Sequence, residues 1–320
     1  MRKEIILCTS LLLALNVYSA ELRGAEGAKK LSGTITLSGA WALYPMAVKW
    51  GEEFRNLHPE VKIDISAGGA GKGMTDALSD MVDIGMVSRE IYPAEVAKGA
   101  WWVSVVKDAV VPTVNAENPF LAKLLKRGVT REEFINIFIT GQVKQWQQLL
   151  GSEAKAEIHV YTRSDACGAA ETWAKYLGKN QENIKGVGVY GDPGLAEAVR
   201  KDLLGIGYNN INFAYDAKSD LPIRGLQILP LDINGDGKIG KDENFYQTRK
   251  EVMAAIAADK YPSPPARALH FVGHGVPKKE LVVEFIKWVL TDGQKQVPAT
   301  GYIALSEAKL QEALGKLKGQ

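Results

Sequence analysis

Three short loops of small residues have the composition of an anion site. They are residues 38–45 (SGAWALYP), 67–73 (AGGAGKG) and 163–169 (RSDACGA), and each follows a strand-like run and precedes a helix-like one. In such a loop, backbone N–H groups at the start of a helix point toward one ligand, and the helix dipole adds roughly half a positive charge there. Three loops that meet in one cleft would therefore hold an anion without a metal ion.

Two arginines lie at the ends of strand-like runs that lead to the expected cleft. Arg163 opens the third loop, and Arg89 follows the apolar run 83–87. The planar guanidinium fork suits tetrahedral oxyanions, and charge-assisted hydrogen bonds are the strong ones. We expect both arginines to contact the anion.

Cys167, in the third loop, permits a second chemistry. A thiol at a helix start ionises more easily than usual, and a thiolate is a nucleophile. A thiol enzyme needs a histidine within reach, but His159 lies eight residues back along a strand-like run, and His270 and His274 are in distant segments. We interpret Cys167 as a serine-sized residue that packs in the loop, with a thiol enzyme as the alternative.

Residues 232–243 (DINGDGKIGKDE) match the calcium-loop pattern at all its sequence-specified positions. The strand-like run 227–231 before the loop contains a proline, so we expect no entering helix and a structural role for the ion. The alternative is a solvated Asp-Gly turn. The expected ligands are the side chains of Asp232, Asn234, Asp236 and Glu243, the carbonyl of Lys238 and a water held near Gly240, with Gly237 at the sharp turn.

The start of the chain has the pattern of a secretory signal peptide. Arg2 and Lys3 precede the apolar run 5–17, and Ser19 and Ala20 offer a cleavage point near residue 19 or 20. Cys8 lacks the small residues expected before a lipid-modified cysteine. A spanning helix needs about 20 apolar residues, and no later segment supplies them. We therefore expect residues 1–20 to be a signal peptide and the protein to be exported.

Composition limits the remaining possibilities. The formal net charge of the 320 residues is +2, which gives no argument for nucleic-acid or membrane binding. Cys167 is the only cysteine after the signal peptide, so no internal disulfide can form. About 300 mature residues are enough for two domains with separate cores.

Strand-like and helical patterns alternate along the chain, which favours an α/β fold with largely parallel sheets. We expect a first lobe from residues 31–115 plus 262–320 and a second lobe from residues 116–261, which contains the calcium-type loop. The expected strands are residues 34–37, 61–65, 83–87, 159–161, 205–208 and 268–272, with residues 101–114 as a strand pair interrupted at Lys107-Asp108.

The order of the three loops, with residues 83–90 (DIGMVSRE) between the second and third and residues 205–208 (GIGY) after them, resembles the phosphate-binding periplasmic component of ABC phosphate importers. The resemblance covers essentially the whole mature chain. It implies two α/β lobes, each with a mixed, mostly parallel sheet flanked by helices, joined by a two-strand hinge. It also implies that the lobes close over a dehydrated phosphate and that the loaded protein docks on a membrane permease.

The resemblance places the anion site at Ala42, Leu43, Ala70, Gly71, Ser88, Arg89, Arg163, Cys167, Gly168 and Ala169. Several positions depart from the family pattern. Leu43, Ala70 and Ala169 replace hydroxyl residues, and Cys167 replaces a serine. Arg89 stands where some members carry an aspartate that accepts a proton from phosphate. Each lost hydroxyl removes a hydrogen bond worth about 1.5–3 kcal/mol with a charged partner. We expect a cationic, amide-lined site that is poor in hydroxyls.

These observations predict an exported, monomeric, non-enzymatic protein that captures phosphate or a related oxyanion for an ABC importer and carries a structural calcium ion. Three alternatives stay open. The same fold could bind another small anion, either a different oxyanion or a carboxylate. The chain could be a thiol enzyme that uses Cys167. It could also be an exported scaffold with a vestigial cleft.

Overall fold

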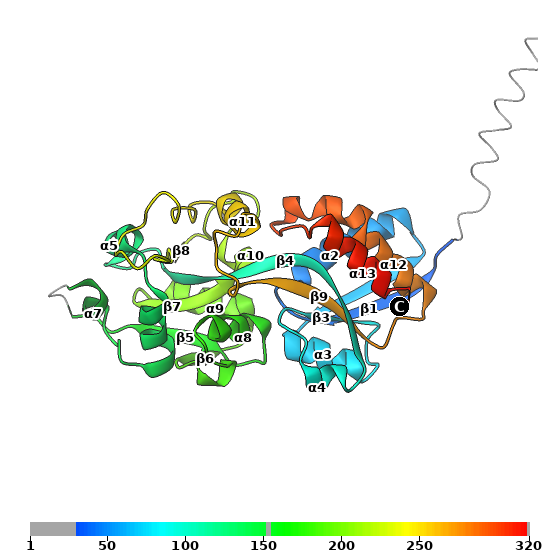
Figure 1. Ribbon diagram of the computed structural model, residues 1–320, viewed down its shortest axis with the longest axis horizontal. Coiled ribbons are helices and arrows are strands. Elements are labelled where there is room, and N and C mark those ends of the chain that lie inside the picture. Colours follow the sequence, from blue (N-terminus) through cyan, green and yellow to red (C-terminus); the bar gives the residue numbers. More distant parts are fainter. Residues whose placement is uncertain (1–29, 152–154, 319–320) are drawn as a thin grey trace, which may run out of the picture.

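Two lobes lie side by side and are joined by two long strands (Figure 1). The computed structural model describes residues 30–151 and 155–318, so the expected signal peptide 1–20 and its cleavage point lie outside the described residues. Within the described residues, no helix is long and apolar enough to cross a membrane.

Nine strands form one sheet that runs through both lobes in the order β2-β1-β3-β9-β4-β7-β5-β6, with β8 paired to β4. The pairs β1·β2, β1·β3, β5·β6 and β5·β7 are parallel, whereas every pair that involves β4 or β9 is antiparallel. The strands are β1 (Gly33–Gly39), β2 (Val61–Ala67), β3 (Ile84–Val87), β4 (Ala100–Asn115), β5 (His159–Arg163), β6 (Val187–Val189), β7 (Gly205–Asn210), β8 (Leu226–Ile228) and β9 (Ala266–His274). The α/β fold class is confirmed.

Helices flank the sheet in each lobe (Figure 1). The first lobe carries α2 (Tyr44–Leu57), α3 (Ala70–Leu78), α4 (Pro93–Val96), α12 (Glu280–Leu290), α13 (Glu307–Lys316) and the 3₁₀ turns Asp292–Gln296 and Pro298–Thr300. The second carries α5 (Leu121–Arg127), α6 (Arg131–Ile135), a π turn (Asn136–Thr140), α7 (Trp146–Leu150), α8 (Gly168–Tyr176), a 3₁₀ turn (Gln181–Asn183), α9 (Gly191–Lys201), α10 (Ile211–Ala214) and α11 (Arg249–Ala257). Short sequence patterns mark where some helices begin. Pro45 lies in the first turn of α2, and Thr130 caps α6 by accepting from the Glu133 amide.

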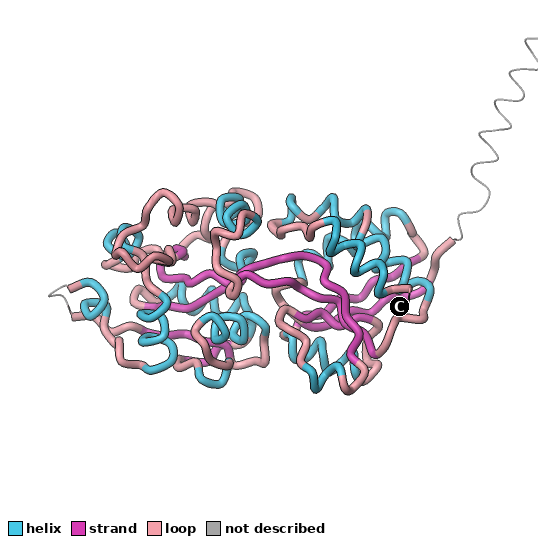
Figure 2. Tube along the Cα trace, in the orientation of Figure 1, coloured by secondary structure: helices cyan, strands magenta, loops and turns pink. Residues whose placement is uncertain are grey.

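The hinge consists of β4 and β9, which pass between the lobes as two continuous strands (Figure 2). β4 pairs with β9 from Ala100 to Ala109 and with β7 from Val110 to Val114. The expected interruption at Lys107-Asp108 is therefore wrong. Both residues keep strand pairing, because Asp108 lies opposite Arg267 on β9 and the buried carboxylate has a guanidinium beside it.

A large hydrophobic core stabilises each lobe, and a small third cluster of Ala196, Val199 and Leu226 lies in the second lobe. The first core includes Phe54 and Phe285, whose ring centroids are 5.1 Å apart. The second includes Trp173 stacked on Tyr208 at 5.8 Å. The boundary between the two large cores lies between residues 106 and 109 on β4 and between residues 266 and 269 on β9. The last part of β4 therefore packs with the second lobe, because it pairs with β7 there, whereas the expected ranges placed all of β4 in the first lobe.

Candidate functional site

The three predicted loops meet between the lobes. The first two follow β1 and β2 of the first lobe, and the third follows β5 of the second. The Gly71 amide donates to the Ala166 carbonyl across the cleft at 3.1 Å. Trp41, in the first loop, lies edge-on to Tyr190 of the second lobe, with ring centroids 6.3 Å apart. Loops that are distant in sequence thus face one another at the carboxyl ends of their strands, where ligands bind in open α/β sheets.

Two glycines allow this close approach. Gly39 has a φ of +131°, and a Cβ there would overlap the Met86 carbonyl oxygen and the Gly73 backbone. A Cβ at Gly168 would overlap the carbonyl and hydroxyl oxygens of Ser88, which belongs to the other lobe. Any side chain at position 168 would therefore hold the lobes apart.

Backbone amides in this cleft are the available donors. Within residues 30–151 and 155–318, no acceptor is found for the amides of Ala42, Ala70, Gly168 and Ala169. The amide of Leu43 is used inside its own loop, where it donates to the Ala40 carbonyl at 3.1 Å, and that of Gly71 is used in the bond to Ala166. Both lobes therefore have N–H groups without a backbone acceptor in the loops that meet between the lobes.

Arg163 is fully buried and already paired with two carboxylates. Its Nε and Nη2 donate to Asp165 at 2.8 and 2.6 Å, and its Nη1 donates to Asp192 at 2.5 Å. Asp192 also accepts from Asn210 Nδ2 at 2.7 Å. The expected cationic character is therefore wrong at this arginine, because two aspartates compensate its charge.

The roles of Asp192 and Asn210 beside Arg163 were not predicted from the sequence. Asp192 had a usable signal, since it follows the short strand β6 and Gly191 in the same way that the predicted loops follow theirs. Asn210, at the end of β7, had no local signal.

Arg89 has partners of its own and faces a different part of the cleft. Its guanidinium forms a two-point ion pair with Glu95 at 2.7 and 3.0 Å and lies 4.3 Å from the ring centroid of Tyr92. It lines an interlobe pocket of about 300 Å³ together with Thr172 of α8 and Arg267 of the hinge. We call this cavity the α8–hinge pocket. The charge of Arg89, like that of Arg163, is compensated within the protein.

Cys167 caps helix α8. Its Sγ accepts from the Ala170 amide at 3.3 Å, and the residue is 4% exposed. Burial raises the pKa of the Cys167 thiol to about 12, although Arg163 acts in the opposite direction. A thiol with this pKa stays protonated at neutral pH and is a poor nucleophile, which agrees with a packing role.

We therefore predict that Cys167 reacts slowly in the folded protein. With iodoacetamide at pH 7.5, alkylation should be at least ~100-fold slower than for a free cysteine, because burial suppresses the thiolate. The same protein unfolded in urea is the control and should react at the free rate. Rapid labelling of the native protein with loss of anion binding would instead support a reactive thiol.

The predicted calcium loop brings its acidic residues together. Carboxylate oxygens of Asp232, Asp236 and Glu243 lie within 4.8 Å of one another. Asp232 is 3% exposed and Glu243 is 6% exposed. Within the described part of the chain, neither has a lysine, arginine or histidine at ion-pair distance; only the exposed Lys238 approaches Asp236, at 3.8 Å. Two buried carboxylates without a basic partner form a donor set that suits a hard cation.

The predicted calcium loop joins two segments of the second lobe. The Ile239 amide donates to the Lys126 carbonyl at 2.9 Å, and the Asp232 amide donates to the Val129 carbonyl at 3.1 Å. The strand β8 precedes the loop, and no helix enters it, as predicted from the proline at 230. The loop therefore ties the end of α5 to the segment after β8.

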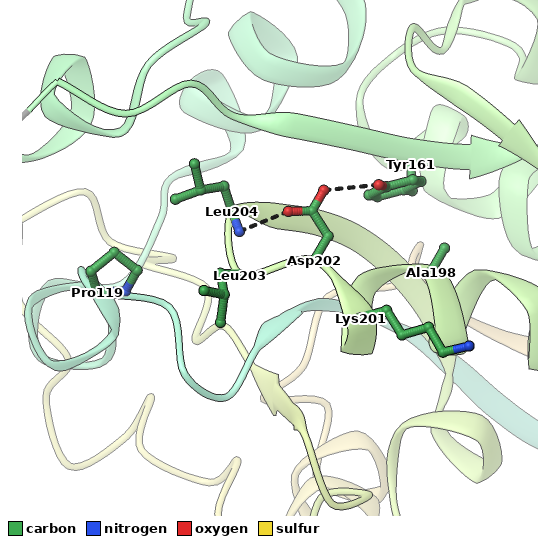
Figure 3. A pocket seen from close by; sticks show the side chains of 7 residues that line it. All are labelled: Pro119, Tyr161, Ala198, Lys201, Asp202, Leu203 and Leu204. Carbon is green, nitrogen blue, oxygen red and sulfur yellow. Dashed lines mark hydrogen bonds between the residues drawn. The ribbon is translucent and has the colours of Figure 1, made fainter.

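A surface cavity of about 670 Å³ lies on the second lobe (Figure 3). The carboxylate of Asp202 in its lining already has hydrogen-bond donors within the protein. It accepts from the Tyr161 hydroxyl at 2.8 Å and from the Leu204 amide at 3.0 Å. None of the predicted anion-site residues lines it. We assign no ligand to this cavity.

Comparisons with known proteins point to one family. A family model described as a PBP superfamily domain matches residues 24–293. The Phosphate-binding protein PstS of Bacillus subtilis is 31% identical over 165 residues, which is 51% of this chain and 52% of that protein, so the match spans about half of that relative. The protein of the same name from Staphylococcus aureus strain USA300 is 24% identical over 301 residues, 92% of this chain and 85% of that protein.

Solved structures show the same fold. A Clostridium perfringens substrate-binding protein with bound phosphate has a TM-score of 0.69 and 21% identity, and the match covers 86% of this chain and 100% of that one. An ABC-type phosphate transport receptor of Vibrio cholerae has a TM-score of 0.60 and 19% identity, over 85% of this chain and 100% of that one.

Proposed function

This chain belongs to the PBP superfamily, and from that membership we propose that it captures phosphate, or a related oxyanion, between its lobes for delivery to an ABC importer. One observation carries the proposal: the first turns of α3 and α8 come from opposite lobes and meet, with the Gly71 amide donating to the Ala166 carbonyl and Gly168 packed against Ser88. Converging N–H groups at helix starts are a site for anions. The phosphate-binding relatives named above support phosphate as the ligand.

The proposal keeps the predicted site residues but changes the roles of some of them. Backbone amides do not depend on the side chain, so the hydroxyls missing at Ala70 and Ala169 leave these N–H groups in place, whereas the Leu43 amide donates to the Ala40 carbonyl. Arg163 orders the third loop through its aspartate partners. The site thus binds through the backbone, and the lost hydroxyls set its affinity and selectivity. No catalytic step is involved.

We predict that Gly168→Ala weakens phosphate binding by at least about tenfold, because its Cβ overlaps Ser88 and opposes closure. Isothermal titration calorimetry on protein freed of endogenous ligand measures this. Gly315→Ala is the matched control, since a Cβ there meets nothing within 4 Å, and its affinity should be unchanged.

The same titrations with arsenate, sulfate and acetate test the ligand class. Preference for phosphate or arsenate agrees with the proposal. Tighter binding of a carboxylate would replace phosphate as the ligand, and no binding of any anion would indicate a vestigial cleft.

The loop 232–243 holds a structural calcium ion in this proposal. Asp232, Asn234, Asp236 and Glu243 supply side-chain oxygens, with the Lys238 carbonyl and a water near Gly240 completing the set. An ion that binds only the folded protein stabilises it by RT ln(1 + [Ca]/Kd), about 2.7 kcal/mol at a hundredfold excess over Kd.

We predict that millimolar calcium raises the melting temperature by several degrees and that a chelator reverses the change. Glu243→Gln removes the bidentate carboxylate and should abolish the shift. Asp64→Asn, an exposed residue on strand β2, is the control and should keep the shift. A melting temperature that ignores both calcium and chelator would show that the segment is an ordinary Asp-Gly turn.

In this proposal the protein acts as an exported, periplasmic monomer after removal of residues 1–20, and its loaded form docks on a membrane permease. The absence of a membrane-crossing helix in residues 30–151 and 155–318 agrees with this.

A further inference from the structure

Trp41 lies in the first loop but belongs to no hydrophobic core. Its neighbours Ala40, Ala42 and Leu43 are buried in the core of the first lobe. Trp41 is only partly buried and is not among the residues that form or cover any of the hydrophobic clusters of the described chain. Within its own lobe, its ring neighbour is Tyr44, with centroids 6.4 Å apart. The loop therefore holds a large aromatic ring outside the core of the first lobe.

The other contacts of this ring are on the second lobe. Trp41 and Tyr190 meet edge to face, with an angle of 86° between the ring planes, which is a preferred geometry for aromatic pairs. A Cβ built at Gly191 would lie 3.4 Å from Cε2 and Cζ2 of Trp41, so the indole rests against the backbone there. The other aromatic ring pairs of the described residues each lie within one lobe.

The segment that Trp41 contacts also holds the third loop. The Gly191 amide donates to Asp165 Oδ1 at 3.2 Å, and the next residue, Asp192, accepts from Arg163 at 2.5 Å. Asp165 accepts from the same guanidinium. The ring of Trp41 therefore connects the first loop to the point on the second lobe from which the third loop is positioned.

The contact is made by the apolar ring and not by a hydrogen bond. The Nε1 atom of Trp41 is buried and has no hydrogen-bond partner among the described residues. Removing an N–H group from water without an acceptor is unfavourable and opposes closure of the lobes. Burial of the ring against the second lobe favours closure. The two effects act in opposite directions, so the contact supports the closed arrangement without locking the lobes together.

An ion pair beside the α8–hinge pocket is a second contact between the lobes. It joins Lys175 of α8 to Glu90 of the first lobe, whose side chains are 47% and 71% exposed. Exposed ion pairs contribute little to stability, because water and salt screen them. The partly buried ring of Trp41 is therefore the stronger candidate for a side chain that keeps the lobes together.

We propose that Trp41 is a positioning residue that holds the closed lobes over the bound anion, through the contact of its ring with Tyr190 and Gly191. This inference rests on the proposed function and adds to it the residue that sets how long the anion stays bound. Because the contact joins residues of different lobes, it forms after the anion has entered. It therefore affects the rate of release and leaves the rate of entry unchanged.

The test measures affinity by calorimetric titration of inorganic phosphate into ligand-free protein, and release by chasing bound radiolabelled phosphate with unlabelled phosphate. Trp41→Ala should accelerate release and weaken affinity by about tenfold each, so that the association rate derived from them stays the same. Trp41→Phe keeps an aromatic ring and should restore both to within about threefold. Trp288→Ala is the matched control, since it removes a partly buried indole that packs on Phe54 within the first lobe, and both quantities should change less than about twofold.

A variant on the other lobe tests the same contact. Tyr190 is 60% exposed, so Tyr190→Ala leaves the core of the second lobe intact and should accelerate release about threefold. Its effect should disappear when Trp41 is already alanine, because the two rings act through one contact.

Three results would count against the inference. Release from Trp41→Ala at the rate of the unchanged protein would overturn it, while leaving the proposed function intact. Trp41→Phe that is as weak as Trp41→Ala would also overturn it, because the effect would then belong to the indole N–H and not to the ring. An unchanged protein that binds none of the oxyanions overturns both the inference and the proposed function.

Discussion

A buried chain of charged hydrogen bonds holds the parts of this protein in their relative positions. It runs from Arg163 through Asp192 and Asn210 to Arg267. These residues come from the end of β5, the start of α9, the end of β7 and the hinge strand β9. Removing one partner of a buried ion pair leaves an uncompensated charge and typically costs about 3–5 kcal/mol. The third loop, and the amides that it presents, are therefore held in place by groups that do not have to contact the ligand themselves.

The features that could be predicted from the sequence are the local ones. The three small-residue loops, the calcium-type loop and most strands have short patterns that the backbone itself requires, such as positive φ at Gly39 and the sharp turn at Gly237. These patterns need no knowledge of distant contacts. The first two loops lie at the same edge because β1 and β2 are parallel, whereas β5 belongs to the other lobe and is connected to them through the antiparallel hinge strands.

The features that were missed depend on long-range partners. Lys107 and Asp108 look like a break in an apolar run until Arg267, 159 positions later, is known to lie opposite Asp108. The compensation of the Arg163 charge by Asp192, 29 positions later, was missed for the same reason, whereas Asp165 lies only two residues from Arg163 in the same loop. Burial and pairing of charges are properties of the folded chain, and one sequence does not show them.

The continuity of β4 and β9 determines how the lobes can move. Two hydrogen-bonded strands form a ribbon, and a ribbon resists sliding and separation but yields readily to torsion. Between Ser104 and Val106 the register with β9 shifts, and such irregularities bend and twist a strand locally. Because these two strands are the long strands that join the lobes, a bend or twist in the ribbon would change the angle between the lobes while the pairing of β4 with β9 is kept.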